Sequence, residues 1–284
     1  MDNLWILFIF IYAFLKGSRE GMKKAALKKS SSNEILFFYT LIGFLMVAPF
    51  SWKAAFITPP LYIFYSFIKA SVVCTAWIFA FLAIKNMSVS LYGIMDLSRM
   101  VFSTMLGVFA LGEDFTLSKA IGVVLVITGL LLVNLKKDAS SKGMTVSVLI
   151  AALLNCFLNA VSGTMDKVLM KSMESAQLQF WFMLFMTLIY GVVLIVRKEK
   201  ISVKCLRYNY WIPVMSISLI VGDKLLFEAN ANPESQVTLM TIIKQSAVLV
   251  TVLTGWIVFK EKHILYKLMC AGIVLSGIFI ALLV

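Results

Sequence analysis

Apolar stretches of about 18–25 residues follow one another along the chain, which is the length that a helix needs to cross a bilayer. Reading hydrophobicity against charges and Pro or Gly breaks places ten such spans, at 3–22, 34–51, 61–84, 88–111, 117–135, 145–167, 176–196, 209–228, 236–259 and 264–283. No segment shows the alternation over about ten residues that marks a membrane β-strand. With 61% apolar and only 14% charged residues, the sequence predicts an all-α, polytopic membrane protein with ten transmembrane helices.

Few residues offer catalytic or cofactor chemistry. The four cysteines have no paired spacing and His263 is the only histidine, so the sequence predicts no zinc site and no acyl-transfer site. It contains no P-loop, Gly-rich dinucleotide loop or GxSxG elbow. The net charge of +12 comes from Lys and Arg clustered at span ends, which is typical of membrane topology and not of nucleic-acid binding. We therefore expect no enzymatic activity, metal, cofactor or nucleic-acid partner.

Basic residues alternate between the connections. KKAALKK, LKKDASSK, RKEKISVKCLR and KEKH follow the first, fifth, seventh and ninth spans, whereas the other connections hold little charge. The positive-inside rule then places these loops in the cytoplasm and both termini outside, in a multi-pass protein of the inner or plasma membrane. The MDNLW start has no basic region and no small-residue cleavage site follows, so we expect no signal peptide.

Two stretches of the sequence repeat each other. LGEDFTLSKAIGVVLVITGLLLV resembles FKEKHILYKLMCAGIVLSGIFIALLV, so that Glu113, Lys119 and Gly129 recur 148 positions later, and YTLIG recurs as MTLIYG at an offset near 147. Glu113 and its counterpart Glu261 each precede a helix, where a carboxylate is favourable at the positive end of the dipole. The offsets predict two halves of five spans, 1–138 and 143–284. An odd number of spans per half gives the halves opposite orientations, as in secondary transporters.

This arrangement resembles the drug/metabolite transporter superfamily and, within it, the EamA-like transporters. The resemblance rests on two five-span halves, each with a Glu followed by Lys and Gly at its last helix. It implies a transporter whose fourth and ninth helices line a central cavity, and it implies cytoplasmic termini, opposite to the charge pattern. The proline that the family often carries before this Glu is absent. Its place is taken by Arg99 or Met100 in the first half and by Ala247 or Val248 in the second half. Because proline kinks helices, one expectation is that these helices are not kinked.

Charges inside the fourth and ninth spans are the main functional signal. Asp96 and Arg99 lie about 12 and 17 Å deep at about 1.5 Å per residue, three positions apart on one helix face. They form either a structural ion pair or one wall of a cavity. Lys244 lies 148 positions after Asp96, at the same depth, with no carboxylate three or four residues away. These residues and the adjacent Gln245 are the first candidates for substrate binding.

Other polar residues at membrane depth extend this candidate site. Lys69, in the third span, binds substrate or else extends to the interface. Asp223 has no helical partner and is, with Asp96, a candidate for proton coupling. Tyr92 and Trp77 are candidate contacts for a cation, with core or lipid-facing packing as the alternative. A polar stripe on the sixth span faces a watery cavity or forms interhelical hydrogen bonds, and it comprises Asn155, Asn159, Ser162 and Asp166.

The sequence therefore predicts a secondary transporter that moves a small polar metabolite, zwitterionic or anionic, by alternating access. Arg99, Lys244 and Lys69 would hold an anionic group, and Asp96 or Asp223 would contact a cationic group or carry a proton. A flippase for a lipid-linked sugar or a phospholipid-like molecule is an alternative. A membrane enzyme acting on lipid and a non-transporting partner subunit are alternatives from other classes. Substrate, direction, coupling by protons or by exchange, and a monomeric or homodimeric state stay open.

Overall fold

The computed structural model describes residues 4–111, 114–135, 145–199, 204–231, 240 and 243–282. The regular elements in these ranges are all helices, so the predicted all-helical fold is confirmed for the described part of the chain. The helices are α1 (Leu4–Ala26), α2 (Ser32–Phe56), α3 (Pro60–Asn86), α4 (Val89–Asp96), α5 (Arg99–Leu111), α6 (Leu117–Leu135), α7 (Val146–Leu169), α8 (Ser175–Val196), α9 (Cys205–Tyr208), α10 (Trp211–Ala231), α12 (Ala247–Phe259) and α13 (Ile264–Leu282).

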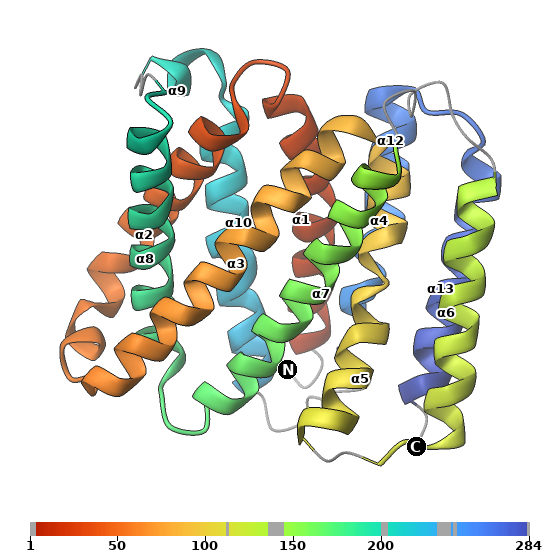
Figure 1. Ribbon diagram of the computed structural model, residues 1–284, viewed down its shortest axis with the longest axis horizontal. Helices are drawn as coiled ribbons and strands as arrows, with labels where there is room; N and C mark the ends of the chain where they lie inside the picture. Colours follow the sequence, from red (N-terminus) through yellow and green to blue (C-terminus); the bar gives the residue numbers. More distant parts are fainter. Residues whose placement is uncertain are drawn as a thin grey trace.

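Helices of the first half pack mainly against helices of the second half (Figure 1). α2 packs on α8 and α6 packs on α13, while the pair α1 and α10 has its counterpart in the pair α7 and α3. The contact between α1 and α12 likewise has its counterpart in the contact between α7 and α5. Exchanging the two halves therefore reproduces the same helix pairs, as expected for a chain built from two related halves.

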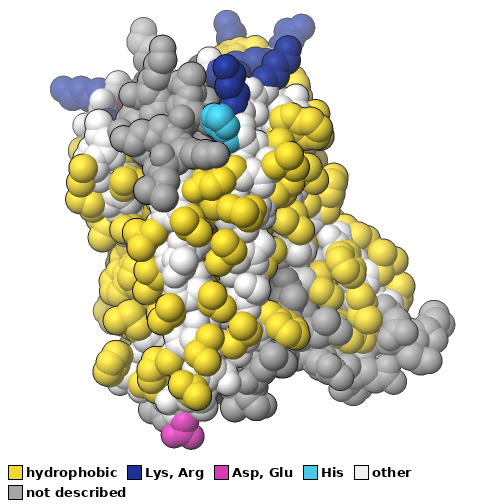
Figure 2. All heavy atoms as spheres, turned by 90° about the vertical axis from the view of Figure 1, so that its right-hand side faces the viewer, with side chains coloured by type: hydrophobic (Ala, Val, Ile, Leu, Met, Phe, Trp, Pro, Cys, Tyr) yellow, Lys and Arg dark blue, Asp and Glu magenta, His cyan; other side chains and the backbone are white. Residues whose placement is uncertain are grey.

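The long helices run between two ends of the bundle (Figure 1). α1 and α7 run in opposite directions, and so do α6 and α13. The connections that follow α1, α8 and α12 lie at one end, and α1 begins and α13 ends at the other. On the face formed by α6 and α13, Lys and Arg side chains gather near His263 at the first end (Figure 2). We refer to the two ends as the basic end and the terminal end.

Five described helices are long and apolar enough, by length and composition, to cross a membrane: α2, α3, α8, α13 and the Val146–Asp166 part of α7. Leu117–Val133 and Ile243–Phe259 are shorter apolar helices. α1 carries Lys16, Arg19 and Glu20 within its length, and it continues to Ala26, beyond the predicted end at residue 22. These charges therefore lie inside the helix and not, as the predicted limits implied, at its end.

The helix of the fourth span is broken. α4 ends at Asp96, α5 begins at Arg99, and the Ser98 N–H donates to the Met95 carbonyl oxygen three residues back, at 2.9 Å. This local tightening from a four-residue to a three-residue hydrogen bond interrupts the helix where no proline is present. The expectation of an unkinked helix is therefore wrong for the first half.

The ninth span is broken at the equivalent place. α12 begins at Ala247, and the Ser246 N–H donates to the Ile243 carbonyl oxygen, again three residues back, at 3.2 Å. Ser246 lies 148 positions after Ser98, which is the offset of the sequence repeat. Each half thus has a helix break at the equivalent position. The expectation of an unkinked helix is therefore also wrong for the second half.

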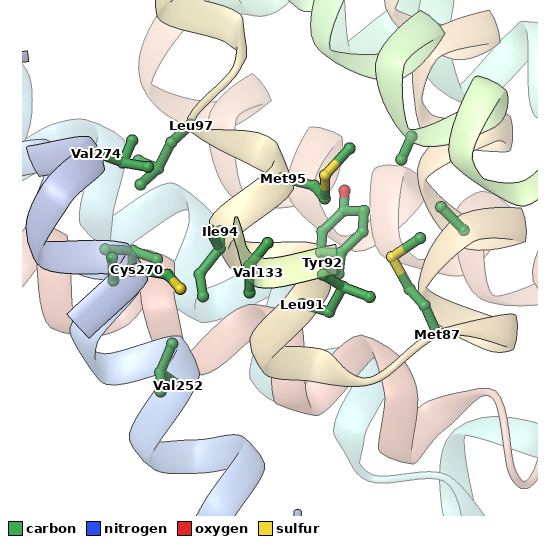
Figure 3. Close-up of a cluster of buried hydrophobic side chains, with 14 of the residues drawn as sticks. Met87, Leu91, Tyr92, Ile94, Met95, Leu97, Val133, Val252, Cys270 and Val274 are labelled. Carbon is green, nitrogen blue, oxygen red and sulfur yellow. The ribbon is translucent and has the colours of Figure 1, made fainter. Parts of the chain in front are cut away.

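The repeated glycines bring α6 close to α13. A Cβ atom built on Gly129 would lie 2.5 Å from a Val274 methyl carbon, and one built on Gly277 would lie 2.8 Å from Leu125 Cβ. These distances leave no room for a side chain, so the helices approach through glycine backbone, as small residues allow in membranes. An apolar cluster beside this contact joins α4 to α6, α12 and α13 (Figure 3), and it includes Ile94, Leu97, Val133, Val252, Cys270 and Val274.

Glu261, the repeated glutamate of the second half, caps a helix of the first half. Its carboxylate accepts hydrogen bonds from the backbone N–H groups of Val89 at 2.6 Å and Ser90 at 3.2 Å, in the first turn of α4. The Lys267 ammonium lies 3.1 Å from the same carboxylate, and both side chains are buried. The sequence placed this glutamate at the start of the helix that follows it. Its counterpart Glu113 lies outside the described residues.

Replacing Glu261 with alanine should lower the stability of the fold by about 3 kcal/mol, because a buried ammonium and two helix N–H groups lose their acceptor. Thermal unfolding in detergent measures this loss. Glu174 is the matched control, since it is an exposed carboxylate that caps its own helix α8. Glu174→Ala should cost only about 1 kcal/mol, and equal losses in the two variants would contradict the capping role of Glu261.

Candidate functional site

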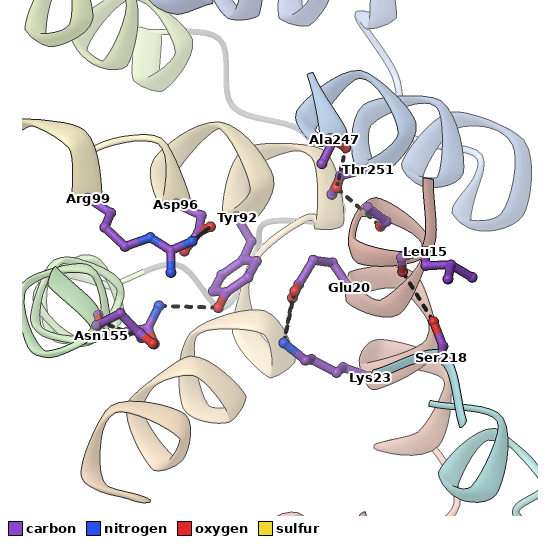
Figure 4. Close-up of polar contacts among 12 residues, drawn as sticks. Leu15, Glu20, Lys23, Tyr92, Asp96, Arg99, Asn155, Ser218, Ala247 and Thr251 are labelled. Atoms are coloured by element: carbon purple, nitrogen blue, oxygen red, sulfur yellow. Dashed lines mark hydrogen bonds and ion pairs between the residues drawn. The ribbon is translucent and has the colours of Figure 1, made fainter. Parts of the chain in front are cut away.

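The break between α4 and α5 holds an ion pair. Arg99 Nη2 lies 2.9 Å from Asp96 Oδ2, and both side chains keep about a quarter of their surface exposed, 28% and 22% respectively. Figure 4 shows the two side chains on the same side of the broken helix, above Tyr92. The predicted pairing of Asp96 with Arg99 is therefore present, and partial exposure leaves it open to a ligand.

Tyr92, one turn before Asp96 on α4, connects this helix to α7, the helix of the sixth span. Its hydroxyl accepts a hydrogen bond from Asn155 Nδ2 at 3.3 Å (Figure 4). Asn159 Nδ2 donates to Asn155 Oδ1 at 2.7 Å. Tyr92 is buried, with 3% of its surface exposed. Tyr92 thus forms a hydrogen bond between α4 and α7 in this structure. Interhelical hydrogen bonding was one of the two roles predicted for the polar stripe on α7 that includes Asn155.

Charges of α1 face the two broken helices. Lys16 and Glu20 line a small pocket of about 20 Å³ together with Asp96 and Gln245. Lys16 and Lys244 both lie within electrostatic range of Arg99. Among the described residues, Lys244 forms no ion pair with a carboxylate. In the described part of the chain, this region therefore gathers more cations than anions, and their excess positive charge suits an anionic group.

A larger cavity of about 250 Å³ lies between α3, α7, α8 and α10. Three charged side chains line it, namely Lys69, Asp166 and Asp223. Lys69 Nζ lies 3.2 Å from Asp166 Oδ1 and 3.8 Å from the centre of the Phe182 ring. Asp223 makes no hydrogen bond or ion pair within the described ranges. The cavity reaches Met170, directly after α7, and Ser175, the first residue of α8, at the terminal end (Figure 1).

Arg19 stands between these two regions. It is 7% exposed, and its Nη1 atom has no hydrogen-bond partner in the described part of the protein. Its guanidinium lies close to the hydroxyl of Tyr39 and within electrostatic range of Asp223. Trp77 packs against Tyr39, with ring centres 5.2 Å apart. Trp77 therefore supports the Arg19 surroundings and lies in an apolar cluster, apart from Arg99 and Lys244.

The structure thus divides the predicted site residues into two groups. Asp96, Arg99, Lys244, Gln245 and Tyr92 lie at the helix breaks, whereas Lys69 and Asp223 share the cavity near the terminal end. Tyr12 of α1 lies within electrostatic range of Asp223 and of Asp96, so the groups are neighbours.

Sequence reasoning missed the charges of α1, because they were taken for the end of the first span. Their spacing was a usable signal, since Lys16, Arg19, Glu20 and Lys23 recur at three- to four-residue steps on one helix face. Glu20 Oε1 and Lys23 Nζ form an ion pair at 2.8 Å, which lowers the cost of burying both (Figure 4). The described residues contain no cluster of three or more His, Cys, Asp or Glu that suits a metal ion.

Apolar helices arranged as two related halves, with charges at matched helix breaks, define a membrane transporter. The family model of the EamA-like transporter family matches the chain twice, at residues 3–135 and 146–283. The chain therefore belongs to this family of the drug/metabolite transporter superfamily, and the resemblance noted from the repeat is confirmed.

The fold is also found among solved structures. A crystal structure titled only "Crystal structure of protein" matches 99% of this chain and 97% of its own chain, with a TM-score of 0.68 and 13% identity. At that identity the likeness concerns the fold alone. A search of curated proteins gives no match.

The cavity at the terminal end should be open to water, and the helix-packing region towards the basic end should be closed. Gln179 lines the cavity, whereas Thr251 is buried and donates to the Gly17 carbonyl oxygen at 3.1 Å. A membrane-impermeant thiol reagent should modify Gln179→Cys from the side on which α1 begins and should leave Thr251→Cys unmodified. All four native cysteines are buried, so background labelling is low. Labelling of Gln179→Cys only from the basic-loop side would contradict this.

Proposed function

We propose that this EamA-like transporter is a secondary transporter that moves a small polar metabolite by alternating access. The observation that carries the proposal is the pair of helix breaks, 148 positions apart, with Asp96 and Arg99 at one and Lys244 just before the other. Broken helices near the middle of related repeats are where such carriers place their substrate site. A rocking motion of the halves about these breaks would expose the site to each side in turn.

The charges at the breaks favour a substrate with an anionic group. Arg99, Lys244 and Lys16 supply cations, and Asp96 together with Glu20 leaves an excess of positive charge. The guanidinium of Arg99 keeps two nitrogen donors for a carboxylate or phosphate while it pairs with Asp96. Lys69 and Asp223, in the neighbouring cavity, would contact the rest of a zwitterionic substrate.

A coupled proton is the proposed driving partner, with substrate exchange as the alternative. Asp223 is the carboxylate best suited to carry the proton, because it lines a cavity and makes no hydrogen bond or ion pair within the described ranges. Asp96 is less suited, since Arg99 holds it at 2.9 Å. Uptake that acidifies the receiving compartment distinguishes coupling from exchange.

For topology we propose ten transmembrane spans in two inverted halves, 1–138 and 143–284, in the inner or plasma membrane. Support comes from the opposite directions of α1 and α7 and from the position of the connections after α1 and α12 at one end (Figure 1), since both connections are rich in lysine. The positive-inside rule then puts the basic end in the cytoplasm and both termini outside. Reporter fusions at each terminus test this, and a cytoplasmic signal from both would overturn it.

A second candidate function is movement of a lipid-like molecule. A cavity of about 330 Å³ adjoins the α4–α5 break and is lined almost entirely by apolar side chains of α5, α6 and α7. Ile127 and Leu131 of its lining are exposed and would face the bilayer, so an acyl chain has lateral access. Transfer of a labelled lipid across vesicles carrying the protein separates this candidate from carriage of a soluble metabolite.

Substituting Lys244 with glutamine should weaken substrate binding by about 30-fold or more, because a half-buried cation that faces the substrate is worth about 2 kcal/mol or more. A thermal-shift screen against metabolite classes in detergent identifies the ligand, and the shift should disappear in Lys244→Gln.

Lys224 provides the matched control, since it lies within α10 over the Phe50 ring, 5.7 Å from its centre, and outside the cavities described above. Lys224→Gln should keep the thermal shift and the uptake. An unchanged ligand shift in Lys244→Gln would remove Lys244 from the site.

A further inference from the structure

Lys69 occupies a place built for an ammonium group. Its Nζ lies 3.2 Å from the Asp166 carboxylate and 3.8 Å from the centre of the Phe182 ring, so one cation touches both a carboxylate and an aromatic face. A carboxylate and an aromatic face together are the usual means by which proteins recognise organic ammonium ions. Here the ammonium is delivered by the protein itself, on a flexible four-carbon stem from α3.

The two sides of this contact differ in exposure. Lys69 is nearly covered, with 7% of its side chain exposed, whereas 38% of the Asp166 side chain is exposed. Both residues line the cavity of about 250 Å³ that reaches the terminal end. A ligand that enters the cavity therefore meets the Asp166 carboxylate directly, and it can compete with Lys69 for it.

The same cavity offers Lys69 a second carboxylate. Asp223, on α10, also lines the cavity and lies within electrostatic range of Lys69, yet it makes no hydrogen bond or ion pair within the described ranges. The three charged residues that line the cavity sum to one negative charge. Arg19 lies within electrostatic range of Asp223 from α1, but it does not line the cavity and lies close to Tyr39. A monocation in the cavity would thus be matched by one carboxylate, with Lys69 matched by the other.

We propose that Lys69 stands in for the ammonium group of the substrate. In the empty carrier Lys69 satisfies Asp166 and Phe182. A substrate ammonium takes that place, and Lys69 moves to Asp223. Asp166 therefore has a cation in both states, and Asp223 gains one when the substrate is bound. This inference rests on the proposed transport function and narrows its substrate class to molecules that bear an organic ammonium group, among which a zwitterion would also use the cations at the helix breaks.

The proposal makes the apparent affinity for an ammonium ligand depend on Lys69. A ligand can bind only to the fraction of molecules in which Lys69 has moved away from Asp166. The observed dissociation constant is therefore the intrinsic constant divided by that fraction. n-Butylammonium is the probe, since it reproduces the lysine side chain, and n-butanol and n-butyrate are the uncharged and anionic comparisons. Binding is measured by titration calorimetry and by thermal shift on the purified full-length protein in detergent.

Lys69→Met should bind n-butylammonium about tenfold or more tightly than the native protein, because the competing cation is gone. Lys69→Arg, which keeps a cation, should bind as weakly as the native protein. Asp166→Asn should abolish binding, and n-butanol and n-butyrate should not bind at this place. Lys224→Met, which removes another lysine at membrane depth, over the Phe50 ring and outside this cavity, should leave binding unchanged.

A separate experiment tests the movement of Lys69 from Asp166 to Asp223. Asp223→Asn should weaken binding in the native background, where Lys69 needs a new partner, and should have no effect in the Lys69→Met background. Equal effects in both backgrounds, or no tightening in Lys69→Met, would overturn the proposal. If Lys69→Met does not fold, unchanged binding in Asp223→Asn alone overturns it. Flux of a different substrate without ammonium binding would leave the proposed transport function standing.

Discussion

The position of α4 depends on a carboxylate from the other half of the chain. Glu261 accepts hydrogen bonds from the first backbone N–H groups of α4. This helix has only eight residues, from Val89 to Asp96, before it is interrupted. Where the helix starts therefore determines where it ends, and its end carries Asp96 and the neighbouring Arg99. A helix N-terminus buried among apolar helices needs such acceptors, because no water is available to replace them. The proposed site at the break is thus positioned by an interaction at the opposite end of α4.

Charge neutralisation inside the bundle follows a simple pattern. Two buried lysines each have a carboxylate beside them: Lys267 pairs with Glu261, and Lys69 pairs with Asp166. Arg19, which is buried, and Lys244, which is half-buried, depart from that pattern, since neither forms an ion pair with a carboxylate among the described residues. Unmatched charge at membrane depth is costly, and such charge is kept where a ligand or a second conformation supplies the partner. These departures support the proposed role of the two regions in substrate binding.

The sequence predicted the parts of this protein that depend on local pattern. The apolar spans, the ion pair of Asp96 with Arg99 and the equal depth of Lys244 all follow from hydrophobicity, spacing and the repeat offset. The charges of α1 were misplaced because hydrophobicity alone ends a span at its first charges, whereas Lys16 and Glu20 are sheltered by other helices. The breaks were missed because proline was taken as their cause, and here three-residue hydrogen bonds before Ser98 and Ser246 suffice. The cap by Glu261 joins residues 172 positions apart, which no local pattern reveals.

The pairing of helices across the halves bears on how the chain is made. α2 has its main partner in α8, α6 in α13 and α1 in α10, and the apolar clusters draw on both halves. The first half is synthesised before these partners, so α1 with its charges and the broken fourth span lack their main packing partners at that stage. Assembly is complete only when α13 has joined α6. A chain that lacks α13 would leave α6 without its main partner, and such a chain would be a target for quality control.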